Sequence, residues 1–369
     1  MNPQAQFCPN KDCRARGKAG AGNIVIHSQK EKRYRCKTCG KTFSETTGTA
    51  MYRVKKDLAL FVIVVTLLAY GCPVQAIVMA FGLDDETVRA WLKKAGQHCQ
   101  GVHEHYMEQS SLELEQVQAD EIKVKIQGGT VWMAMGMMVR TRLWLGGVVG
   151  ANRDKGLIRE LTGQIRQWAL CRPILVAVDG FSAYLKSFRE AFRSPYKGGK
   201  GGRPCLYVWE EVAIVQVIKR RVQATLTVEH RIAQGCAELV ERLIVASQKA
   251  GTINTAFIER LNATFRQRLA CLVRRGRALA RQVATLQSGM FLVGGVYNFC
   301  TPHDSLRLPV WLPKNRVHWV QRTPAIAAAL TNHCWSVEDL LSFKLPLAPF
   351  VPPKRRGRPP KQALLEVPT

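Results

Sequence analysis

The run VQADEIKVKI, residues 117–126, decides the fold class, because it reads as a β-strand that carries acids in its interior. Two further strand-like runs follow at once, VWMAMGMMV (131–139) and RLWLGGVVG (142–150). The links between the three runs are short, Gly-Gly-Thr at 128–130 and Arg-Thr at 140–141. Connections of this length predict an antiparallel meander.

The segments after the meander alternate between helical and strand-like patterns. In chain order we expect a helix at 155–169, a buried strand at 173–180, a helix at 181–192, a loop at 194–204, a strand or hairpin at 210–226 and helices from about 232 to 300. Three strands, helix, strand, helix, strand, helix is the order of an RNase H-like domain. The expected fold class is therefore α/β, with an RNase H-like mixed sheet flanked by helices over residues 113–310.

Residues 51–112 read as a separate helical domain ahead of that sheet. Helices are expected at 58–69 and 74–81, and a Gly-bearing turn leads to a third helix that begins at Asp84 or Asp85, where an acid can cap the N-terminus. Helix, turn and helix of this size are a helix-turn-helix candidate, although any helical hairpin fits the same pattern. In the DNA-binding interpretation, the third helix offers three cations to DNA: Arg89, Lys93 and Lys94.

Four of the twelve cysteines form two pairs near the N-terminus, Cys8-x4-Cys13 and Cys36-x2-Cys39. Tetrahedral zinc takes four soft ligands, and a short knuckle lets two cysteines converge from one turn. Residues 1–50 are therefore predicted to be a zinc ribbon in which the four sulfurs hold one structural Zn²⁺. The alternative is a set of unrelated thiols in a reducing cytosol, which is how the other, scattered cysteines read.

The charge balance indicates a polyanionic partner. The 369-residue chain carries 54 Lys and Arg against 27 Asp and Glu, a net charge of +27. Double-stranded DNA is the first candidate and an anionic membrane surface the second. The longest apolar run, Leu58 to Ala69, is too short to span a bilayer, and the N-terminal residues do not read as a signal peptide. We therefore expect a cytoplasmic, nucleoid-associated protein without a membrane partner.

Acids inside apolar strands require an explanation, because a buried carboxylate is costly unless it is paired or binds metal. Asp120 lies within the first strand, and Asp179 ends the apolar run LVAVD. Neighbouring strands can bring the two together, and Glu259 on a packed helix is the expected third carboxylate. Such a trio could hold two Mg²⁺ ions, or Mn²⁺, for phosphodiester displacement. Glu121 competes with Asp120, but strand alternation puts the two on opposite faces, so only one is expected in the site.

The helix INTAFIERLNATFRQRL, residues 253–269, carries Glu259 and a set of polar neighbours. Asn262 and Arg266 follow Glu259 at i+3 and i+7 and share its face. Apolar residues form a separate stripe beside that face. We expect Arg260, Asn262 and Arg266 to hold DNA phosphate. The alternative is a solvated face with one salt bridge.

Residues 311–369 are expected to be a C-terminal extension that ends in a Pro-rich, basic, disordered tail. Its run KRRGRPPK, at 354–361, places Arg356 and Arg358 in an extended chain. Such a chain can enter an A·T minor groove, as an AT-hook does. A solvated basic tail is the alternative.

Six segments together resemble the DDE transposases of prokaryotic insertion sequences, most closely the insertion-sequence-one-like group. In chain order they are RYRCKTCGKTF, GCPVQAIVMAFGLDDETVRAWLKKAG, QADE, VDGFSAY, INTAFIERLNATFRQRL and YNFCTPHDSLR. The resemblance implies an RNase H-like core with Asp120, Asp179 and Glu259 as metal ligands. It also implies a zinc ribbon and a helix-turn-helix that recognise the element's ends, and a homodimer or higher homo-oligomer on DNA. Three features depart from the group. The first Cys knuckle is x4 rather than x2, Ile122 and Lys123 stand where relatives often carry an aromatic residue, and 80 positions separate Asp179 from Glu259.

The sequence therefore predicts an enzyme, a transposase that binds the ends of a mobile DNA element and catalyses metal-dependent strand cleavage and strand transfer. Two other classes fit parts of the pattern. A non-catalytic DNA-binding regulator would need the ribbon, the helix-turn-helix and the basic tail, but not three acids inside the core domain. A nuclease that cuts without joining would need the acids as well. Metal-dependent joining of a pre-cut end separates the three classes.

Overall fold

The computed structural model describes residues 1–196, 203–222, 225–248, 251–273, 280, 282–313 and 316–352. The chain divides into two compact units. The smaller unit comprises Met1–Gly48 and the C-terminal segment from Pro346, and the larger comprises Thr49–Leu345. Each unit has its own buried apolar core. Within the described ranges, no helix combines the length and the apolar character needed to cross a bilayer.

The smaller unit is built around a three-stranded antiparallel sheet in the order β1-β2-β3. Its elements are a 3-10 turn η1 (Pro3–Ala5) and the strands β1 (Ile24–Ser28), β2 (Arg33–Cys36) and β3 (Thr42–Ser44). In its small core, Tyr34 and Phe43 stack across β2 and β3 with ring centroids 5.9 Å apart. Gly40 follows Cys39 with φ 70°, a left-handed conformation that favours glycine, and so lets the chain turn into β3.

Three helices open the larger unit: α1 (Leu58–Ala69), α2 (Val74–Phe81) and α3 (Asp85–Gln109). The bounds predicted for the first two, and the predicted start of the third, are confirmed. The Asp84 carboxylate accepts the backbone N–H of Thr87 (3.2 Å) and caps α3, and Gly82 ends α2 with φ 59°. By its contacts, α3 belongs to the core of the larger unit, since it packs along α8 (Val283–Gly295).

The centre of the larger unit is a six-stranded mixed sheet in the order β11-β10-β7-β4-β5-β6. Its strands are β4 (Glu115–Ile126), β5 (Gly129–Met138), β6 (Trp144–Gly150), β7 (Ile174–Val178), β10 (Val212–Val222) and β11 (Thr225–Gln234). β4, β5 and β6 form the expected antiparallel meander. β7 pairs in parallel with both β4 and β10, and β11 completes the hairpin that the sequence left open as an alternative. The predicted α/β class, with a mixed sheet and flanking helices, is confirmed.

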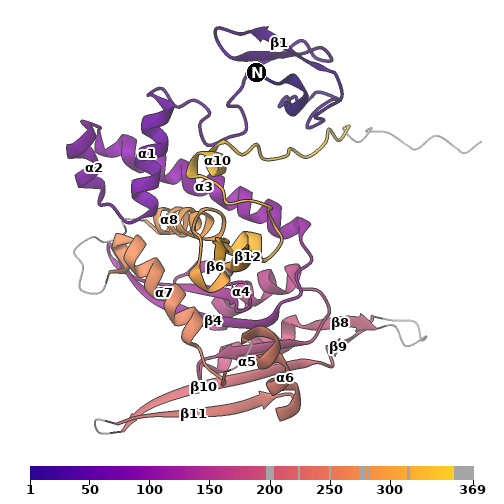
Figure 1. Cartoon of the computed structure of the whole chain (residues 1–369), viewed down its shortest axis with the longest axis vertical. Coiled ribbons are helices and arrows are strands. Elements are labelled where there is room, and N and C mark those ends of the chain that lie inside the picture. The colour runs from indigo at the N-terminus through magenta and orange to yellow at the C-terminus, as the bar shows by residue number, and fades with distance from the viewer. Residues whose placement is uncertain are drawn as a thin grey trace, which may run out of the picture. The chain divides into compact units, whose positions relative to one another are not determined.

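Helices cover both faces of this sheet (Figure 1). α4 (Lys155–Trp168) and α5 (Ser182–Ala191) lie on one face, where Val117 and Ala119 of β4 are buried. α7 (Ala256–Arg268) and α8 lie on the other face, over Ile122 and Val124 of β4. On that same face, α6 (Ala237–Gln248) covers β7 and β10. The strand β4 is therefore buried on both sides, so an acid within it needs partners.

Shorter elements complete the larger unit. They are β8 (Arg193–Tyr196), β9 (Cys205–Val208), η2 (Ala270–Leu272), the π-helical turn η3 (Val296–Cys300), η4 (Asp304–Leu306), β12 (Leu308–Leu312), β13 (Arg316–Val320), α9 (Pro324–Ala327) and α10 (Val337–Ser342).

Two hairpins correct the sequence-based predictions. β8 pairs with β9 at the ends of segment 194–204, which was predicted to be a loop, while residues 197–202 lie outside the described part of the chain. β12 pairs with β13, so the expected domain boundary at residue 310 falls inside a strand. Both segments contain proline, which argues against a central strand but is tolerated where a strand has a free edge. The prolines of β12 and its turn are Pro309 and Pro313.

Candidate functional site

Two acids come together where β4 and β7 separate. The strands pair up to Gln118 and Ala177, after which β7 ends at Val178. Asp120 lies two residues beyond the last pair on β4, and Asp179 is the first residue after β7. The end of one strand and the free edge of its neighbour thus place both carboxylates at one point of the sheet. The sequence predicted this convergence.

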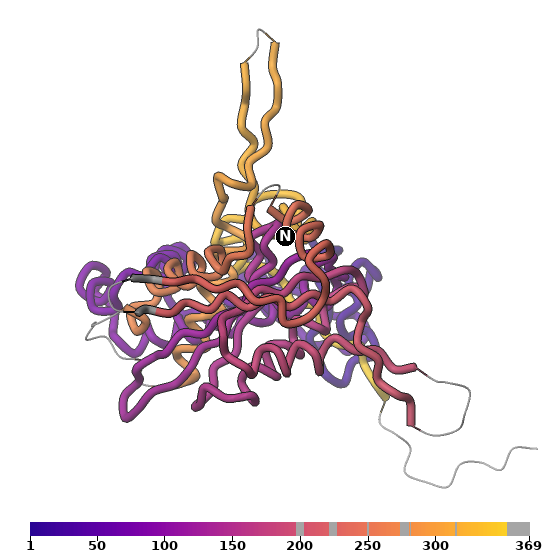
Figure 2. Tube along the Cα trace, turned by 90° about the horizontal axis from the view of Figure 1, so that it is seen from below, coloured from indigo at the N-terminus to yellow at the C-terminus, as the bar shows by residue number. Residues whose placement is uncertain are grey.

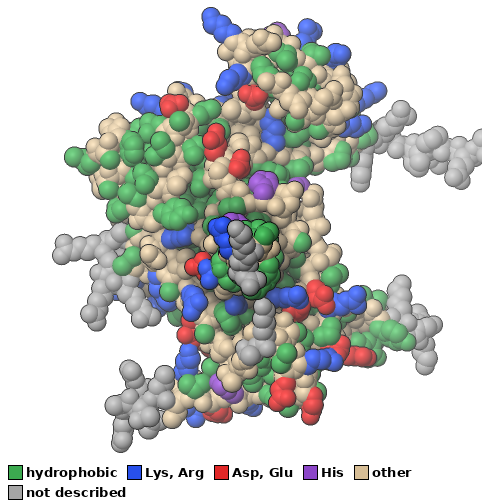
Figure 3. All heavy atoms as spheres, in the orientation of Figure 1, with side chains coloured by type: hydrophobic (Ala, Val, Ile, Leu, Met, Phe, Trp, Pro, Cys, Tyr) green, Lys and Arg blue, Asp and Glu red, His purple; other side chains and the backbone are tan. Residues whose placement is uncertain are grey.

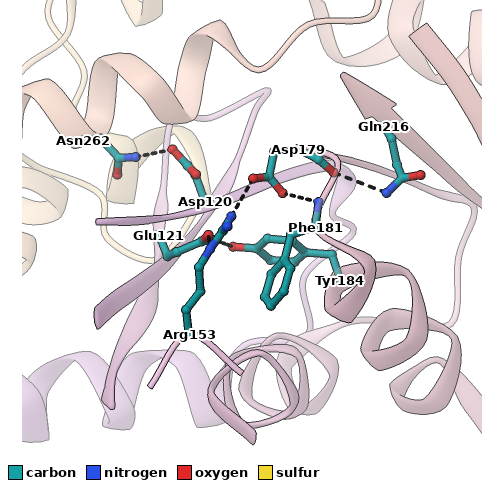
Figure 4. A network of polar contacts seen from close by, with 8 residues as sticks. All are labelled: Asp120, Glu121, Arg153, Asp179, Phe181, Tyr184, Gln216 and Asn262. Carbon is teal, nitrogen blue, oxygen red and sulfur yellow. Dashed lines mark hydrogen bonds and ion pairs between the residues drawn. The ribbon is translucent and has the colours of Figure 1, made fainter. Parts of the chain in front are cut away.

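Asp120 lies on the face of the sheet that α7 covers. There the side-chain amide of Asn262 donates a hydrogen bond to its Oδ2 (2.7 Å), as Figure 4 shows. Burial, reinforced by the negative charges of Glu121, Asp179 and Glu259, raises the pKa of Asp120 to about 7. A carboxyl group with this pKa is half protonated near neutrality unless a cation joins it.

Asp179 is fixed by contacts from three parts of the fold. Its Oδ1 accepts the backbone N–H of Phe181 (2.9 Å), and its Oδ2 accepts a hydrogen bond from the Arg153 guanidinium (2.8 Å) (Figure 4). Its backbone carbonyl accepts the side-chain amide of Gln216 on β10 (3.4 Å). Both the side chain and the backbone of this acid are therefore held in place before any ligand binds.

Glu121 joins the two aspartates, contrary to the sequence-based expectation. It points to the opposite face of β4, as alternation requires, where the Tyr184 hydroxyl donates to its Oε2 (2.6 Å) and Arg153 forms an ion pair with it. Yet one carboxylate oxygen from each of Asp120, Glu121 and Asp179 lies within 4.8 Å of the other two. The prediction that only one of the two neighbours enters the site is therefore wrong. Because β7 has already ended, the edge of β4 is open here, and side chains from both faces converge around it.

Arg153 supplies positive charge within this acidic group. It precedes α4, and its single guanidinium contacts both Glu121 and Asp179. The same guanidinium lies over the ring of Phe181, with Cζ 4.4 Å from the ring centroid. An arginine in this place lowers the repulsion among the acids and can offer hydrogen bonds to an anionic ligand.

Glu259 lines the same cavity as the two aspartates. The cavity has a volume of about 650 Å³, and its wall includes Asp120, Asp179, Glu259 and Lys219. Lys219 forms an ion pair with Oε1 of Glu259, and the Thr255 hydroxyl donates to the same oxygen (2.7 Å). Burial alone would raise the pKa of Glu259, but these two hydrogen bonds outweigh it and hold the pKa below its usual value. Glu259 is therefore an ionised acid at the cavity wall, outside the closely spaced group of carboxylates.

One buried side chain anchors the helix that carries Glu259. Gln118 of β4 donates from Nε2 to the carbonyl of Asn254 (2.8 Å) and accepts the backbone N–H of Ile258 at Oε1 (2.9 Å). These two bonds tie the start of α7 to the strand that bears Asp120. The predicted apolar stripe on this segment is confirmed, since its members are all buried: Ile258, Leu261, Phe265, Leu269 and Leu272.

The polar residues of α7 that were expected to meet DNA differ in their surroundings. Asn262 is only 1 % exposed, and its amide nitrogen bonds Asp120. The prediction that it holds DNA phosphate is therefore corrected, because it packs inside the site and orients the acid. Arg260 is exposed and Arg266 is half-buried, and for these two the DNA contact stays a prediction.

The cations expected to reach DNA from α3 also differ from one another. Arg89 forms a two-point hydrogen-bonded pair with Asp85, one turn earlier. Lys94 turns inward, where its amine donates to the Tyr52 carbonyl and burial lowers its pKa. The prediction for Lys94 is corrected, since its charge is used inside the unit, whereas Lys93 is exposed. Two further expected DNA contacts lie outside the described residues: Arg356 and Arg358.

Four cysteines of the smaller unit form a second candidate metal centre. The Sγ atoms of Cys8 and Cys39 are 3.6 Å apart, those of Cys13 and Cys36 are 3.9 Å apart, and all four lie within 4.8 Å of one another. Burial opposes ionisation of Cys36, but the backbone amides of Cys39 and Thr38 outweigh it and lower its pKa to about 7. Four sulfurs around one point, one of them readily ionised, can hold a soft divalent metal. The predicted grouping of these four cysteines is confirmed, and it includes the first pair, whose spacing is the longer of the two.

Four polar residues around the acids were not anticipated: Gln118, Arg153, Tyr184 and Lys219. A signal existed for Gln118, because a polar residue inside an apolar strand needs hydrogen-bond partners once the strand is buried. The other three gave no signal, since they reach the acids from segments whose positions depend on the whole fold.

Asp120→Asn is expected to stabilise the protein at pH 8 in the absence of divalent metal. The folded-state pKa of about 7 lies above the ordinary value of 3.8, so ionisation of Asp120 costs the folded state free energy. This cost is absent below about pH 4, grows as the pH rises towards 7, and is constant above that. Asn cannot ionise and keeps an oxygen for Asn262, so the variant should gain about 4 kcal/mol in the free energy of unfolding at pH 8 and almost nothing at pH 4.

Urea unfolding in a chelating buffer at the two pH values measures this difference. The control is Glu190→Gln, because Lys155 holds the pKa of that half-buried acid below its usual value, so removal of the charge should give no gain. A lower stability of Asp120→Asn at pH 8 would contradict the account of this carboxyl group.

The cavity brings acids and cations around one open space. Carboxylate oxygens of Asp120, Glu121 and Asp179, with Glu259 on the same wall, can bind divalent cations that prefer oxygen ligands. Arg153 also lines this space and can bind an anionic group. No protein-family model matches this chain, and no curated protein does.

Proposed function

We propose that this protein is a DDE transposase, which cuts the ends of a mobile DNA element and joins them to a target. The observation that carries the proposal is the placement of Asp120, Asp179 and Glu259 around one open cavity of about 650 Å³. The resemblance described above agrees with it, because three of the six segments contribute these acids: QADE, VDGFSAY and INTAFIERLNATFRQRL.

The strand order supports an RNase H-like interpretation of the sheet. Five neighbouring strands of the sheet lie in the spatial order β6, β5, β4, β7 and β10. By their order in the chain, these are the third, second, first, fourth and fifth strands of the sheet. An antiparallel meander continued by parallel strands puts the first and fourth strands side by side. Asp120 lies on the first of those strands and Asp179 directly follows the fourth, while α7, the second helix after the sixth strand, brings Glu259.

The residues present fit divalent metal ions. Asp120, Asp179 and Glu259 would hold two Mg²⁺ ions, with Mn²⁺ as the other candidate. The raised pKa of Asp120 supports this fit, because a cation relieves a surplus of negative charge in a partly buried site. Bound ions would activate the attacking oxygen and offset the charge that develops on the leaving oxygen.

The chain's own side chains would orient the reactants. Arg153 and Lys219 would hold non-bridging oxygens of the scissile phosphate, and Asn262 would keep Asp120 oriented. In the cutting step, a water oxygen bonds to phosphorus as the bond from phosphorus to the 3′ oxygen breaks, and the leaving oxygen regains the proton that the attacker loses. In the joining step, the freed 3′-hydroxyl attacks a target phosphodiester in the same way. Each step exchanges one P–O bond for another, so neither needs an external energy source.

The N-terminal parts of the chain would bind the element's ends. The four cysteines would hold one structural Zn²⁺ and so order the smaller unit. α2, the turn at Gly82 and α3 are the candidate helix-turn-helix, with Lys93 as an exposed cation. A homodimer or higher homo-oligomer on DNA belongs to the same proposal, because two ends must be joined together.

Two other functions use part of the same features. A DNA-binding regulator would use the cysteine cluster and α1 to α3 but leaves the acidic cavity without a purpose. A nuclease would use the cavity for cutting alone. The test is to incubate the protein with Mg²⁺, a plasmid and a labelled, pre-cut duplex that carries the inverted repeat flanking the coding region. Joined product supports the transposase. Binding without cutting or joining supports the regulator, and cutting without joining supports the nuclease.

In this assay Glu259→Gln is expected to lower joining by on the order of 10²-fold or more, while binding to the ends persists. The substitution keeps the size and a hydrogen bond to Thr255 but removes the charge that a metal ion requires. Glu121→Gln is the informative comparison, because Glu121 is bound by Tyr184 and Arg153 and would act by positioning Arg153. It should lower joining only about tenfold.

The reverse order of effects would reassign the third metal ligand. If Glu121→Gln is as inactive as Asp120→Asn while Glu259→Gln joins ends normally, the ligands are the three closely spaced carboxylates rather than the acid on α7.

A further inference from the structure

An arm of the larger unit stands apart from its body. β12 and β13 pair from Leu308↔Val320 at the base to Leu312↔Arg316 towards the tip, and neither pairs with another strand among the described residues. Every residue of both strands is exposed, and Figure 2 shows the hairpin projecting from the rest of its unit. A two-stranded ribbon by itself is marginally stable in water, so this arm is expected to have a partner.

Both faces of the arm carry exposed apolar side chains. One face, here called the Trp face, carries Pro309 and Trp311 opposite Trp319 and Val317. Trp311 is 72 % exposed, more than any other aromatic side chain in the described part of the chain. The other face adds four exposed apolar residues: Leu308, Val310, Leu312 and Val320. Figure 3 looks along the arm and shows apolar side chains at the centre of the view. Apolar surface of this extent marks a site of interaction.

The chemistry of the Trp face favours a protein partner over DNA. Its four side chains carry no charge, whereas DNA phosphates and base edges are bound mainly by cations and hydrogen-bond donors. Arg316 belongs to the opposite face, and Arg307 at the base covers the ring of Trp319, with Cζ 4.3 Å from the ring centroid. Residues 305–337 contain no acid. Two arms would therefore bring cations against cations, whereas the hollow of the body around Tyr106 and Trp335 is lined by no Lys or Arg, so an arm is expected to pack against a body.

The body of the larger unit offers a hollow that suits such an arm. A cavity of about 550 Å³ is lined by Tyr106, Trp335, Ile326 and Leu330, among others. Its wall shares no residue with the acidic cavity. Aromatic walls favour a further aromatic ring, and the volume is sufficient for an indole. We propose that the arm of one copy docks on a second copy of this chain, with Trp311 in this aromatic cavity, and that the exchange is reciprocal.

The surface available on the arm agrees with a stable dimer. The exposed parts of its apolar side chains come to on the order of 600 Å² for each arm. The total area buried by two docked arms, together with the surfaces that they cover, would therefore exceed the roughly 1,600 Å² buried in a standard protein interface. The inference rests on the proposed function, because it specifies a contact for the homodimer named there, and it is tested without DNA or metal. A monomeric chain that still joins ends would overturn this inference alone, whereas a dimer that joins no ends would overturn the transposase proposal alone.

The test is the mass of the full chain in solution, measured by sedimentation over a range of concentrations. Trp311→Lys should raise the dissociation constant of the dimer roughly 100-fold, because a central Trp is a typical hot spot. Ala329→Arg, at the exposed rim of the aromatic cavity, should have a similar effect. Tyr207→Lys is the matched control, since Tyr207 is 60 % exposed on the other hairpin, β8–β9, and should leave the mass unchanged.

Mixing the two weakened variants tests the exchange itself. A pair made of one Trp311→Lys chain and one Ala329→Arg chain has one arm and one cavity intact, so the mixture should regain dimers that neither variant forms alone. A monomeric parent protein, a Trp311→Lys variant with the parent's mass, or a mixture that stays monomeric would each overturn the proposal. If Trp311→Lys keeps the dimer but loses affinity for duplex DNA, the arm is a DNA-binding element instead.

Discussion

Asp179→Asn is expected to lower the rates of end cleavage and strand joining by on the order of 10³-fold or more, while binding to the element's ends persists. Asn keeps the shape of the side chain and can still accept the backbone N–H of Phe181. It lacks the negative charge that a divalent cation requires. Because Arg153 retains its ion pair with Glu121, the fold around the site should remain intact.

The measurement is joining of a labelled, pre-cut end in the presence of Mg²⁺. The double variant with Asp120→Asn should be no less active than either single variant, because loss of one ligand already disables the site. Glu211→Gln is the control, since Glu211 precedes β10 at the opposite end of β7 and pairs with Arg242. Normal joining by Asp179→Asn would exclude the metal-dependent mechanism at this cavity.

Cys36→Ser is expected to abolish zinc binding and to unfold the smaller unit. Cys36 is the thiol whose pKa falls to about 7, so it provides a thiolate at neutral pH at the lowest cost. The apolar core of this unit is small, and its stability would rest on a metal-binding free energy of roughly 10 kcal/mol. Loss of the metal-binding free energy should leave residues 1–48 accessible to protease and weaken binding to the element's ends.

Metal analysis of protein purified under reducing conditions gives the direct measurement. The parent should hold one zinc ion per chain, and Cys36→Ser none. Cys171→Ser is the matched control, because Cys171 is exposed and lies in the larger unit. A parent protein that contains no zinc, yet resists protease over its first 48 residues, would show that the four sulfurs are unrelated thiols.

The features that the sequence predicted correctly are local in the chain. The bounds of α1 and α2 and the start of α3 follow from apolar periodicity together with Asp84 as a cap and Gly82 as a stop signal. The convergence of Asp120 and Asp179 also follows from local patterns, because each lies at a recognisable place in a strand and neighbouring strands share an edge. The cysteine cluster was visible in spacing alone.

The features that the sequence did not predict depend on contacts between distant segments. Whether Glu121 enters the site depends on where β7 stops pairing with β4. The alternation of apolar and polar residues within 117–126 does not reveal that point. Arg153 and Lys219 lie in segments whose approach to the acids is set by the complete sheet. Lys94 and Asn262 were assigned to DNA from their helical positions, but neighbouring elements turned both inward. A helical wheel gives the direction of a side chain and not what lies in that direction.

Gln118 also has a consequence for how this chain can change over evolution. The interval of 80 positions between Asp179 and Glu259 contains α5, two hairpins and α6. Most of that length does not set the place of Glu259, because the start of α7 is bonded directly to the strand that carries Asp120. From within the interval, β10 adds Lys219 as the ion-pair partner of Glu259. Insertions and deletions can therefore accumulate in the interval outside β10 while the acids keep their spacing. The β8–β9 hairpin, whose described residues do not line the acidic cavity, is free to acquire new recognition roles without disturbing the chemistry.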